Sequence, residues 1–276
     1  MKKQFKTTTL RPAISLALSC SIALLTAACG GGGGGTAEAP PAFTPVTRQA
    51  TLTTLQETPA PTLPDAAAAT PGGTASFTLY STNKLRGSMT LTGFTLSGTP
   101  QTTAVTAAHI HDGDVGVAGG VVVALLPDAS KVVWSLPANT VLDDAKVARF
   151  KAGGYYVNAH TNTNAPGLIR GQLISFADNV QTIFTASCAL STCHVPSGIA
   201  PMPLQAGASI GNLVNVNSVA STPSGVRVVP GNSGNSVLFK RINGSITPTM
   251  PLNRGPLAAS EQNLIKVWID MGANNN

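Results

Sequence analysis

From residue 51 to residue 175 the chain consists of short β-prone runs separated by Gly, Pro, Asn and Thr. Examples are "GTASFTLYS", "LRGSMTLTGFTL", "GGVVVALLP" and "GGYYVNAHT". Short strands at near-regular spacing favour antiparallel β-structure, and helical periodicity is absent through most of this region. The sequence therefore predicts an antiparallel β-sandwich over residues 48–175.

The pattern changes to helical spacing near residue 176. "SFADNVQTIFTASC" carries Val180, Ile183 and Phe184 on one helical face, and "ASEQNLIKVWIDMG" repeats apolar residues at i, i+4 and i+7. We therefore predict a multidomain chain, in which a small all-α domain over residues 176–276 follows the β-sandwich.

The first 28 residues have the layout of a signal peptide. Four basic residues precede an uncharged apolar run that ends in small residues. Cys29 follows "LLTAA" and resembles the lipid-attachment cysteine of bacterial lipoproteins, with simple cleavage and release as the alternative. Residues 29–47 then form a Gly-rich and Pro-rich tether. We expect the protein in the bacterial cell envelope, held by its lipid to a membrane that we take to be the outer membrane.

Most of the basic charge belongs to the predicted signal. The chain has 17 Lys and Arg against 11 Asp and Glu, and four of the basic residues precede Cys29. The 13 that remain nearly balance the acids, so the charge gives no argument for nucleic-acid binding. Of four cysteines, Cys20 leaves with the signal and Cys29 is the proposed lipid site, so only Cys188 and Cys193 remain.

Four segments in the β-rich half resemble the chordin-type (CHRD) domain. They are "LQETP", "AAHIHDGDVGVAGGVVVAL", "GGYYVNAHT" and "PGLIRGQL", and the resemblance spans residues 48–175. It implies a compact β-sandwich of the kind found in exported bacterial proteins, and it does not imply an enzyme. We therefore expect this domain to act as a binding or scaffold module.

Three histidines lie in these segments. Because side chains alternate along a strand, His109 and His111 point the same way, and His160 on another strand can converge with them. Neutral imidazoles suit copper or zinc, so a metalloprotein is one reading. The reading that we favour from sequence is structural: the histidines are hydrogen-bonded inside the sandwich, with Glu57 or Arg170 as partners.

The segment "SCALSTCHVPSG" places His194 directly after Cys193, with Cys188 five residues earlier. Covalent haem needs two thiols and a histidine directly after the second, usually as C-x-x-C-H, whereas four residues separate the thiols here. A disulfide between Cys188 and Cys193 is an alternative, and another metal site is a weaker one because this half has no other Cys or His.

Three segments in residues 177–273 resemble a bacterial single-haem cytochrome c-like domain: "VQTIFTASCALSTCHVPSG", "VPGNSGNSVLFKRINGS" and "TPTMPLNRGPLAASEQNLIKVWIDMGA". The resemblance implies one covalent haem c on Cys188 and Cys193, with His194 and Met250 as axial iron ligands. Met202 is the rival to Met250.

The sequence thus favours an electron carrier over an enzyme, with an unknown redox partner. No nucleophile–base pair or paired-carboxylate motif is identifiable, so a hydrolase has no support. The alternative is a non-redox cell-surface binding or adhesion module with a cell-surface ligand, in which a Cys188–Cys193 disulfide closes the loop.

We predict that the mature chain begins at an acylated Cys29, because this cysteine ends an apolar export segment and precedes a flexible tether. Mass spectrometry of the mature N-terminus tests this. Cys29→Ser should release the protein from membranes, since the acyl chains supply the anchor. A free N-terminus beginning at another residue contradicts the prediction.

Overall fold

The computed structural model describes residues 43–63, 70–93, 105–200, 202–219 and 224–276. The predicted signal peptide, Cys29 and most of the predicted tether lie outside these residues. Residues 42–276 form one compact unit. None of the helices in the described part of the chain has the length and hydrophobicity of a transmembrane segment.

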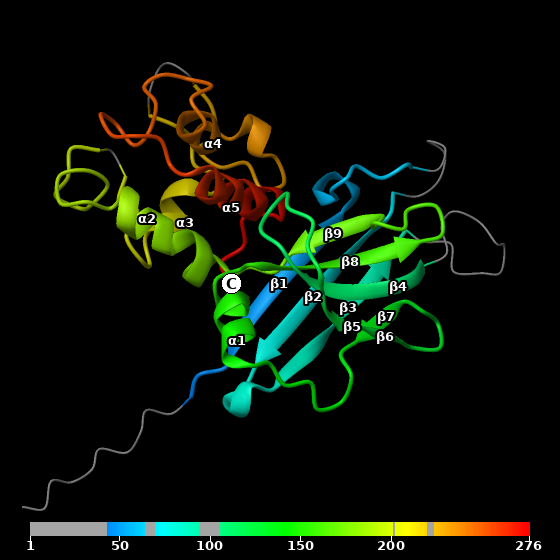
Figure 1. The fold of residues 1–276 in the computed structure, drawn as a ribbon. Helices are drawn as coiled ribbons and strands as arrows, with labels where there is room; N and C mark the ends of the chain where they lie inside the picture. The colour runs from blue at the N-terminus through cyan, green and yellow to red at the C-terminus, as the bar shows by residue number, and fades with distance from the viewer. Residues whose placement is uncertain (1–42, 64–69, 94–104, 201, 220–223) are drawn as a thin grey trace, which may run out of the picture. The chain divides into compact units, whose positions relative to one another are not determined.

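Within the described residues, nine strands form one sheet in which every neighbouring pair is antiparallel, with the order β5-β4-β8-β9-β1-β2-β3-β7-β6 (Figure 1). The strands are β1 (Val46–Thr53), β2 (Gly72–Leu79), β3 (Leu85–Thr92), β4 (Val105–Asp112), β5 (Val121–Ala124), β6 (Leu126–Pro127), β7 (Val133–Ser135), β8 (Tyr155–Thr161) and β9 (Ile169–Gln172). The predicted antiparallel β-fold is confirmed. Its strands belong to one continuous sheet rather than to two separate ones.

Alternation of side chains explains how this sheet encloses a core. In β2 the residues Ala75, Phe77 and Leu79 are buried and the residues between them face outward. Met89 of β3 and Ile110 of β4 come from strands far apart in the sheet order, yet both belong to the same buried cluster. The sheet therefore curls around a single apolar interior.

One α-helix lies within the β-rich half. Helix α1 (Asp144–Lys151) precedes β8, and the side chain of Asp143 caps it by accepting a hydrogen bond from the backbone N–H of Lys146. Phe150 of this helix is fully buried in the core of the sheet. Two short 3₁₀ turns, η1 (Thr54–Gln56) and η2 (Ser81–Asn83), follow β1 and β2.

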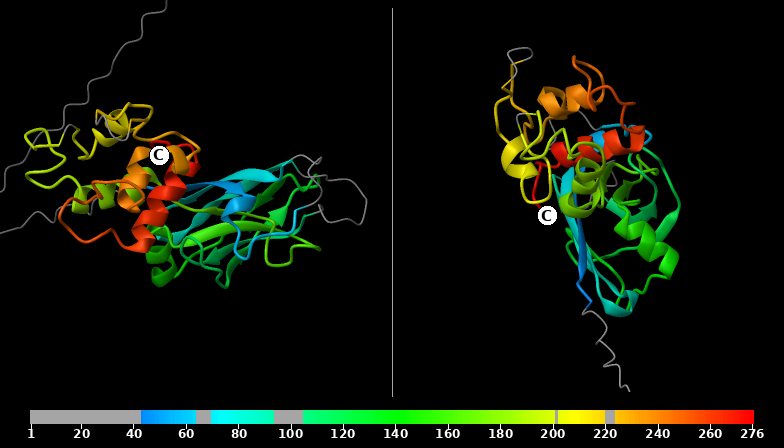
Figure 2. Two further views of the ribbon diagram at one scale, coloured as in Figure 1. Left: turned by 90° about the horizontal axis from the view of Figure 1, so that it is seen from above. Right: turned by 90° about the vertical axis from the view of Figure 1, so that its left-hand side faces the viewer.

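The C-terminal region contains short helices joined by long irregular segments (Figures 1 and 2). They are η3 (Phe176–Val180), α2 (Gln181–Ser187), α3 (Ser209–Leu213), η4 (Ser233–Asn235), α4 (Val237–Ile242) and α5 (Ala259–Asp270). The predicted helical pattern at both ends of this region is present. Most of the chain between α2 and α5 is irregular, so the region is less helical than the sequence suggested.

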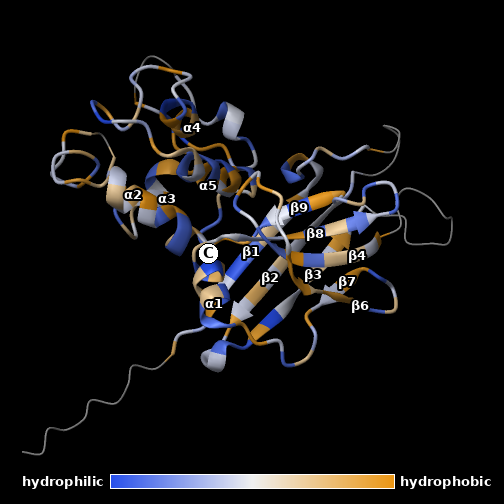
Figure 3. Cartoon of the chain, viewed as in Figure 1, coloured by the Kyte–Doolittle hydropathy of each residue, from blue (hydrophilic) through white to orange (hydrophobic). Residues whose placement is uncertain are grey.

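A second apolar cluster holds these helices together. The ring centroids of Phe176 and Trp268 are 5.1 Å apart, and Phe184 meets each of these rings edge-on at 6.2 Å. Helix α5 carries hydrophobic and hydrophilic residues in alternation, as expected for a helix with one buried face (Figure 3).

The buried guanidinium of Arg48 links β1 to the start of the C-terminal region. Its Nη1 lies 2.8 Å from a carboxylate oxygen of Asp178 and also donates to the hydroxyl of Ser175, while Nη2 donates to the backbone carbonyl of Lys151. The buried Nε of Arg48 has no hydrogen-bond partner among the described residues, so the Nη contacts must offset the cost of burying the charge. These contacts hold the chain path between β9 and η3.

We predict that Arg48→Met lowers the free energy of unfolding by about 2–4 kcal/mol, because it removes the buried donors and leaves the Lys151 carbonyl with only the longer hydrogen bond from Asn179. Urea denaturation measures the change. The matched variant Asp178→Asn should cost less than about 1 kcal/mol, since that carboxylate is 55% exposed. Equal losses in the two variants would contradict this role for Arg48.

Candidate functional site

Strands β4, β8 and β9 bury apolar side chains on one face and polar side chains on the other. Ile110 and Val157 lie in the main core. At alternate positions, His111, Asn158 and Arg170 point to the opposite face, where they are buried too. Burial of polar groups is costly unless each finds a partner, so this polar face requires a dedicated network.

The three predicted histidines come together on this face. One ring nitrogen from each of His109, His111 and His160 lies within 4.8 Å of the others. The Nδ1 atom of His109 is 2.9 Å from Nε2 of His160. In the strand register His160 lies opposite Ala107, two positions from His109, so a diagonal cross-strand contact brings these rings together.

Backbone carbonyls fix the protonation of two of these rings. Nδ1 of His111 lies 2.9 Å from the carbonyl oxygen of Gly119, and Nδ1 of His160 lies 2.8 Å from that of Ala165. A carbonyl only accepts, so Nδ1 carries the proton in both rings and each Nε2 presents a lone pair. Nε2 of His160 then accepts the hydrogen bond from Nδ1 of His109.

The environment keeps all three imidazoles neutral. Burial, with smaller effects of the neighbouring His160 and His111, lowers the pKa of His109 to about 4. Burial is also the main cause that lowers the pKa values of His111 and His160, against the effect of their backbone hydrogen bonds. The cluster therefore offers uncharged ring nitrogens at neutral pH.

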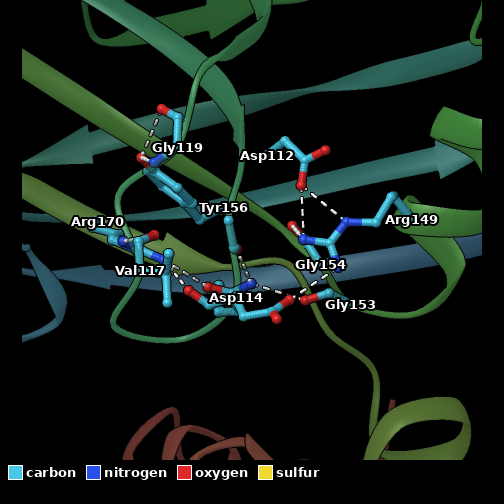
Figure 4. A network of polar contacts seen from close by, with 11 residues as sticks. Asp112, Asp114, Val117, Gly119, Arg149, Gly153, Gly154, Tyr156 and Arg170 are labelled. Atoms are coloured by element: carbon cyan, nitrogen blue, oxygen red, sulfur yellow. Dashed lines mark hydrogen bonds and ion pairs between the residues drawn. The ribbon is translucent and has the colours of Figure 1, made fainter.

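The guanidinium of Arg170 lies next to the histidine cluster, because it contacts the Tyr156 ring that stacks on His111. The ring of Tyr156 stacks on that of His111 with centroids 4.9 Å apart and planes 8° apart. The guanidinium of Arg170 lies 3.5 Å from the centroid of the Tyr156 ring, and it donates to the backbone carbonyls of Asp114 and Val117 (Figure 4). Arg170 therefore ties the loop after β4 to the sheet.

The same loop carries the carbonyl that orients His111. The hydroxyl of Tyr156 accepts a hydrogen bond from the backbone N–H of Gly119, as Figure 4 shows. A Cβ atom on Gly119 would lie 1.5 Å from the carbonyl oxygen of Asp112. Any side chain at this position would displace the loop. At the loop's exposed edge, Arg149 forms ion pairs with Asp112 and Asp114.

Glu57 is buried beside this network. Among the described residues it forms no hydrogen bond with the three histidines. Its Oε1 accepts from the backbone N–H of Thr58, and its Oε2 has no hydrogen-bond partner among the described residues. Burial raises the pKa of Glu57 to about 7, although the Thr58 N–H, Arg170 and Asn158 each oppose the shift. The expected partners Glu57 and Arg170 thus lie near the cluster, while carbonyl oxygens hold the rings.

The second set of predicted residues also comes together. Cys188 ends α2, and Cys193 and His194 follow in the next loop. Two adjoining cavities, of about 230 and 280 Å³, share Cys188, His194 and Met250 in their walls. Both cysteines are free thiols and both are partly buried.

His194 is oriented by a backbone carbonyl, as His111 and His160 are. Its Nδ1 lies 3.0 Å from the backbone carbonyl oxygen of Met202, so Nδ1 donates and Nε2 keeps its lone pair. Burial lowers the pKa of His194 despite this bond. Burial, with smaller effects of Cys193 and Glu261, raises the pKa of Cys188 to about 11, so this thiol stays protonated at neutral pH.

The two rival methionines differ in position. Met250 lies in the wall of both cavities, whereas Met202 lies in the wall of the larger one alone. The backbone N–H of Met250 donates to the carbonyl of Arg241 at the end of α4. Met202 contributes its carbonyl, and that contact to His194 does not depend on its side chain.

The cavity walls also include arginines that no sequence motif marks. Arg227 and Arg241 border the larger cavity and Arg254 borders the smaller one. Ile199, which also lines the smaller cavity, is 89% exposed. Basic residues scattered over some 30 positions form no sequence motif, so only the fold reveals that they share one site.

Comparison with protein families finds a CHRD domain at residues 48–173, which confirms the resemblance seen in the β-rich half. The match begins within β1, ends just after β9 and does not reach η3. Searches of curated proteins and of solved structures gave no match.

The raised pKa of Glu57 leads to a prediction about stability and pH. The folded chain holds the Glu57 proton more tightly than the unfolded chain, for which 4.5 is the ordinary pKa. Ionisation of Glu57 therefore costs stability as the pH rises from 4.5 through 7. We expect Glu57→Gln to gain stability relative to the natural chain between pH 5 and pH 8, by about 3 kcal/mol at most.

Urea unfolding of both proteins at several pH values measures this difference. Subtracting one profile from the other removes the contribution of the histidines, which acts in the opposite direction between pH 4 and 6.5. A difference that does not change with pH would show that the Glu57 pKa is not raised in the folded chain.

Proposed function

We propose that this chain, which carries a CHRD domain at residues 48–173, binds one haem c covalently in its C-terminal region and transfers single electrons. One observation carries the proposal: both free thiols, the adjacent imidazole and Met250 line a single apolar site. The haem, when bound, supplies a reversible one-electron Fe(III)/Fe(II) couple.

The thiols fit covalent attachment. Cys188 and Cys193 are neighbours in the wall of the smaller cavity, and both are free thiols. Each thiol would be joined to the haem by addition of its S–H across one vinyl double bond, with sulfur on one carbon and hydrogen on the other. The four residues between the thiols form a turn closed by the bond from the Cys193 N–H to the Leu190 carbonyl.

His194 and Met250 would be the two protein ligands of the haem iron, since both line the cavities. The Met202 carbonyl holds the proton on Nδ1 of His194, so Nε2 carries the lone pair that would bind the haem iron. The same hydrogen bond increases the basicity of Nε2. Met250 supplies a neutral, soft thioether in the same cavities. Such a His/Met pair favours Fe(II) and raises the potential relative to anionic ligands.

Exposed apolar residues at the cavity rims support a large apolar ligand. Ile199, Val219 and Leu252 are 89%, 69% and 49% exposed, and each lines one of the two cavities. A bound porphyrin would cover them and gain hydrophobic free energy. Arg227 and Arg241 would place positive charge beside the two carboxylates of the porphyrin.

For the rest of the chain we propose a supporting role in the cell envelope. Cys29 would carry the lipid that holds the protein to a membrane, and residues 29–47 would separate that membrane from the CHRD domain. The CHRD domain would serve as the binding or scaffold module beside the redox site. The chemistry thus belongs to the haem, and the chain positions it and sets its potential.

Two methionine variants test the ligand assignment. We expect Met250→Ala to retain covalent haem but to open the sixth position, which lowers the midpoint potential by on the order of 0.1 V. Met202→Ala keeps the carbonyl that orients His194, so its spectrum and potential should stay close to those of the natural chain. Absorption spectra and redox titration of protein produced with haem-maturation machinery provide the measurement.

Cys193→Ala tests the attachment itself and should reduce or abolish covalent haem in the same expression system. If acid–acetone extracts all haem from the natural chain, the proposal fails. Recovery of an intact Cys188–Cys193 disulfide in that system would instead support the non-redox binding module.

A further inference from the structure

We propose that His109, His111 and His160 bind one transition-metal ion of the copper or zinc class on the polar face of the sheet. This site is separate from the proposed haem site and does not depend on it. It revises the expectation, drawn from the sequence, that the histidines only stabilise the fold.

The donor atoms are prepared as metal ligands usually are. Backbone carbonyls of Gly119 and Ala165 hold the Nδ1 protons of His111 and His160, so both Nε2 lone pairs are available towards the centre of the cluster. A ligating histidine almost always donates its other N–H to such an oxygen, because that bond fixes the ring and its tautomer. Neutral His109 needs only to move its proton from Nδ1 to Nε2 to offer the third lone pair.

Unsatisfied atoms at the cluster support a missing ligand. Nε2 of His111 is buried and has no hydrogen-bond partner among the described residues, although the residue is only 7% exposed. The buried Oδ1 of Asn158 also lacks a partner, and the Asn158 side chain is close enough to His111 to raise its pKa. Two buried acceptors without a donor carry a desolvation cost that a bound cation would offset.

Three imidazoles also indicate which ion fits. Imidazole suits copper and zinc, whereas calcium and magnesium need oxygen ligands. The three ring nitrogens, within 4.8 Å of one another, can close on a single ion with bonds of about 2.0–2.1 Å. With three protein ligands a fourth position stays open for water or another small ligand.

The surroundings hold the rings in place but are not neutral. The His111 ring stacks against the Tyr156 ring, and the guanidinium of Arg170 lies over the same Tyr156 ring. These contacts limit the tilt of His111. The charge of Arg170 opposes a cation, and Glu57, which interacts electrostatically with Arg170, supplies the compensating carboxyl. Such fixed neighbours favour a preorganised site.

Metal analysis of the full chain, purified with a tag free of histidine, tests the proposal. Cu²⁺ and Zn²⁺ are added singly, excess is removed by dialysis, and copper, zinc and iron are counted separately so that haem iron does not interfere. We expect one copper or zinc per chain, with nitrogen splitting in the electron paramagnetic resonance spectrum of the Cu²⁺ form.

Combining His109→Ala with His160→Ala should weaken binding by at least about 100-fold, because two of three ligands are lost. His109→Gln is the milder variant: this ring is only partly buried, so the fold should survive while affinity falls. Asp114→Asn is the matched control for binding driven by loop carboxylates and should keep full occupancy, since that side chain is 58% exposed.

Two outcomes would overturn the proposal. One is a natural chain that retains neither copper nor zinc after dialysis, which would leave the histidines with a structural role alone. The other is a folded His109→Gln chain that binds either ion as tightly as the natural chain, which would place the ion elsewhere.

Discussion

The polar face of strands β4, β8 and β9 depends on the contacts of the buried Arg170 guanidinium. This guanidinium sits on the ring of Tyr156 and donates to two carbonyls of the loop after β4 and to the amide oxygen of Gln172. A buried positive charge is stable only with such partners, so the loop must close over it. The closed loop in turn brings the Gly119 carbonyl to His111, which fixes that ring in one tautomer.

The same kind of hydrogen bond, from Nδ1 to a backbone carbonyl, orients histidines in the CHRD domain and in the C-terminal region. His111, His160 and His194 each place Nδ1 within 3.0 Å of a backbone carbonyl oxygen, from Gly119, Ala165 and Met202. In each ring Nε2 carries the lone pair, which in His160 accepts a hydrogen bond from His109, and burial lowers the pKa of each ring. A neutral, oriented imidazole suits metal or haem iron better than it suits proton transfer near neutral pH. This shared geometry supports both proposals, the haem on the C-terminal region and the metal ion on the sheet.

The sequence predicted which side chains share a face of each strand, but it did not predict the hydrogen-bond partners of the histidines. Period-two spacing placed His109 and His111 on one face and Tyr156, Asn158 and His160 on one face, and the structure has them so. The partners of these rings are carbonyls of loops, and side-chain identity carries no information about where a loop carbonyl points. The same limit explains why Glu57 and Arg170 were expected to bond the histidines directly. In the C-terminal region, the thiols and His194 formed a readable motif, whereas the arginines of the cavity walls are dispersed in sequence.

Covalent haem on Cys188 and Cys193 is the central claim, and the intact mass of the denatured chain tests it most directly. The protein is produced with haem-maturation machinery and unfolded in acid, and its intact mass is measured by mass spectrometry. We expect a single species whose mass exceeds that of the processed, lipid-bearing polypeptide by the mass of one haem. A mass equal to that of the processed polypeptide, or lower by the two hydrogens lost in a disulfide, would contradict it.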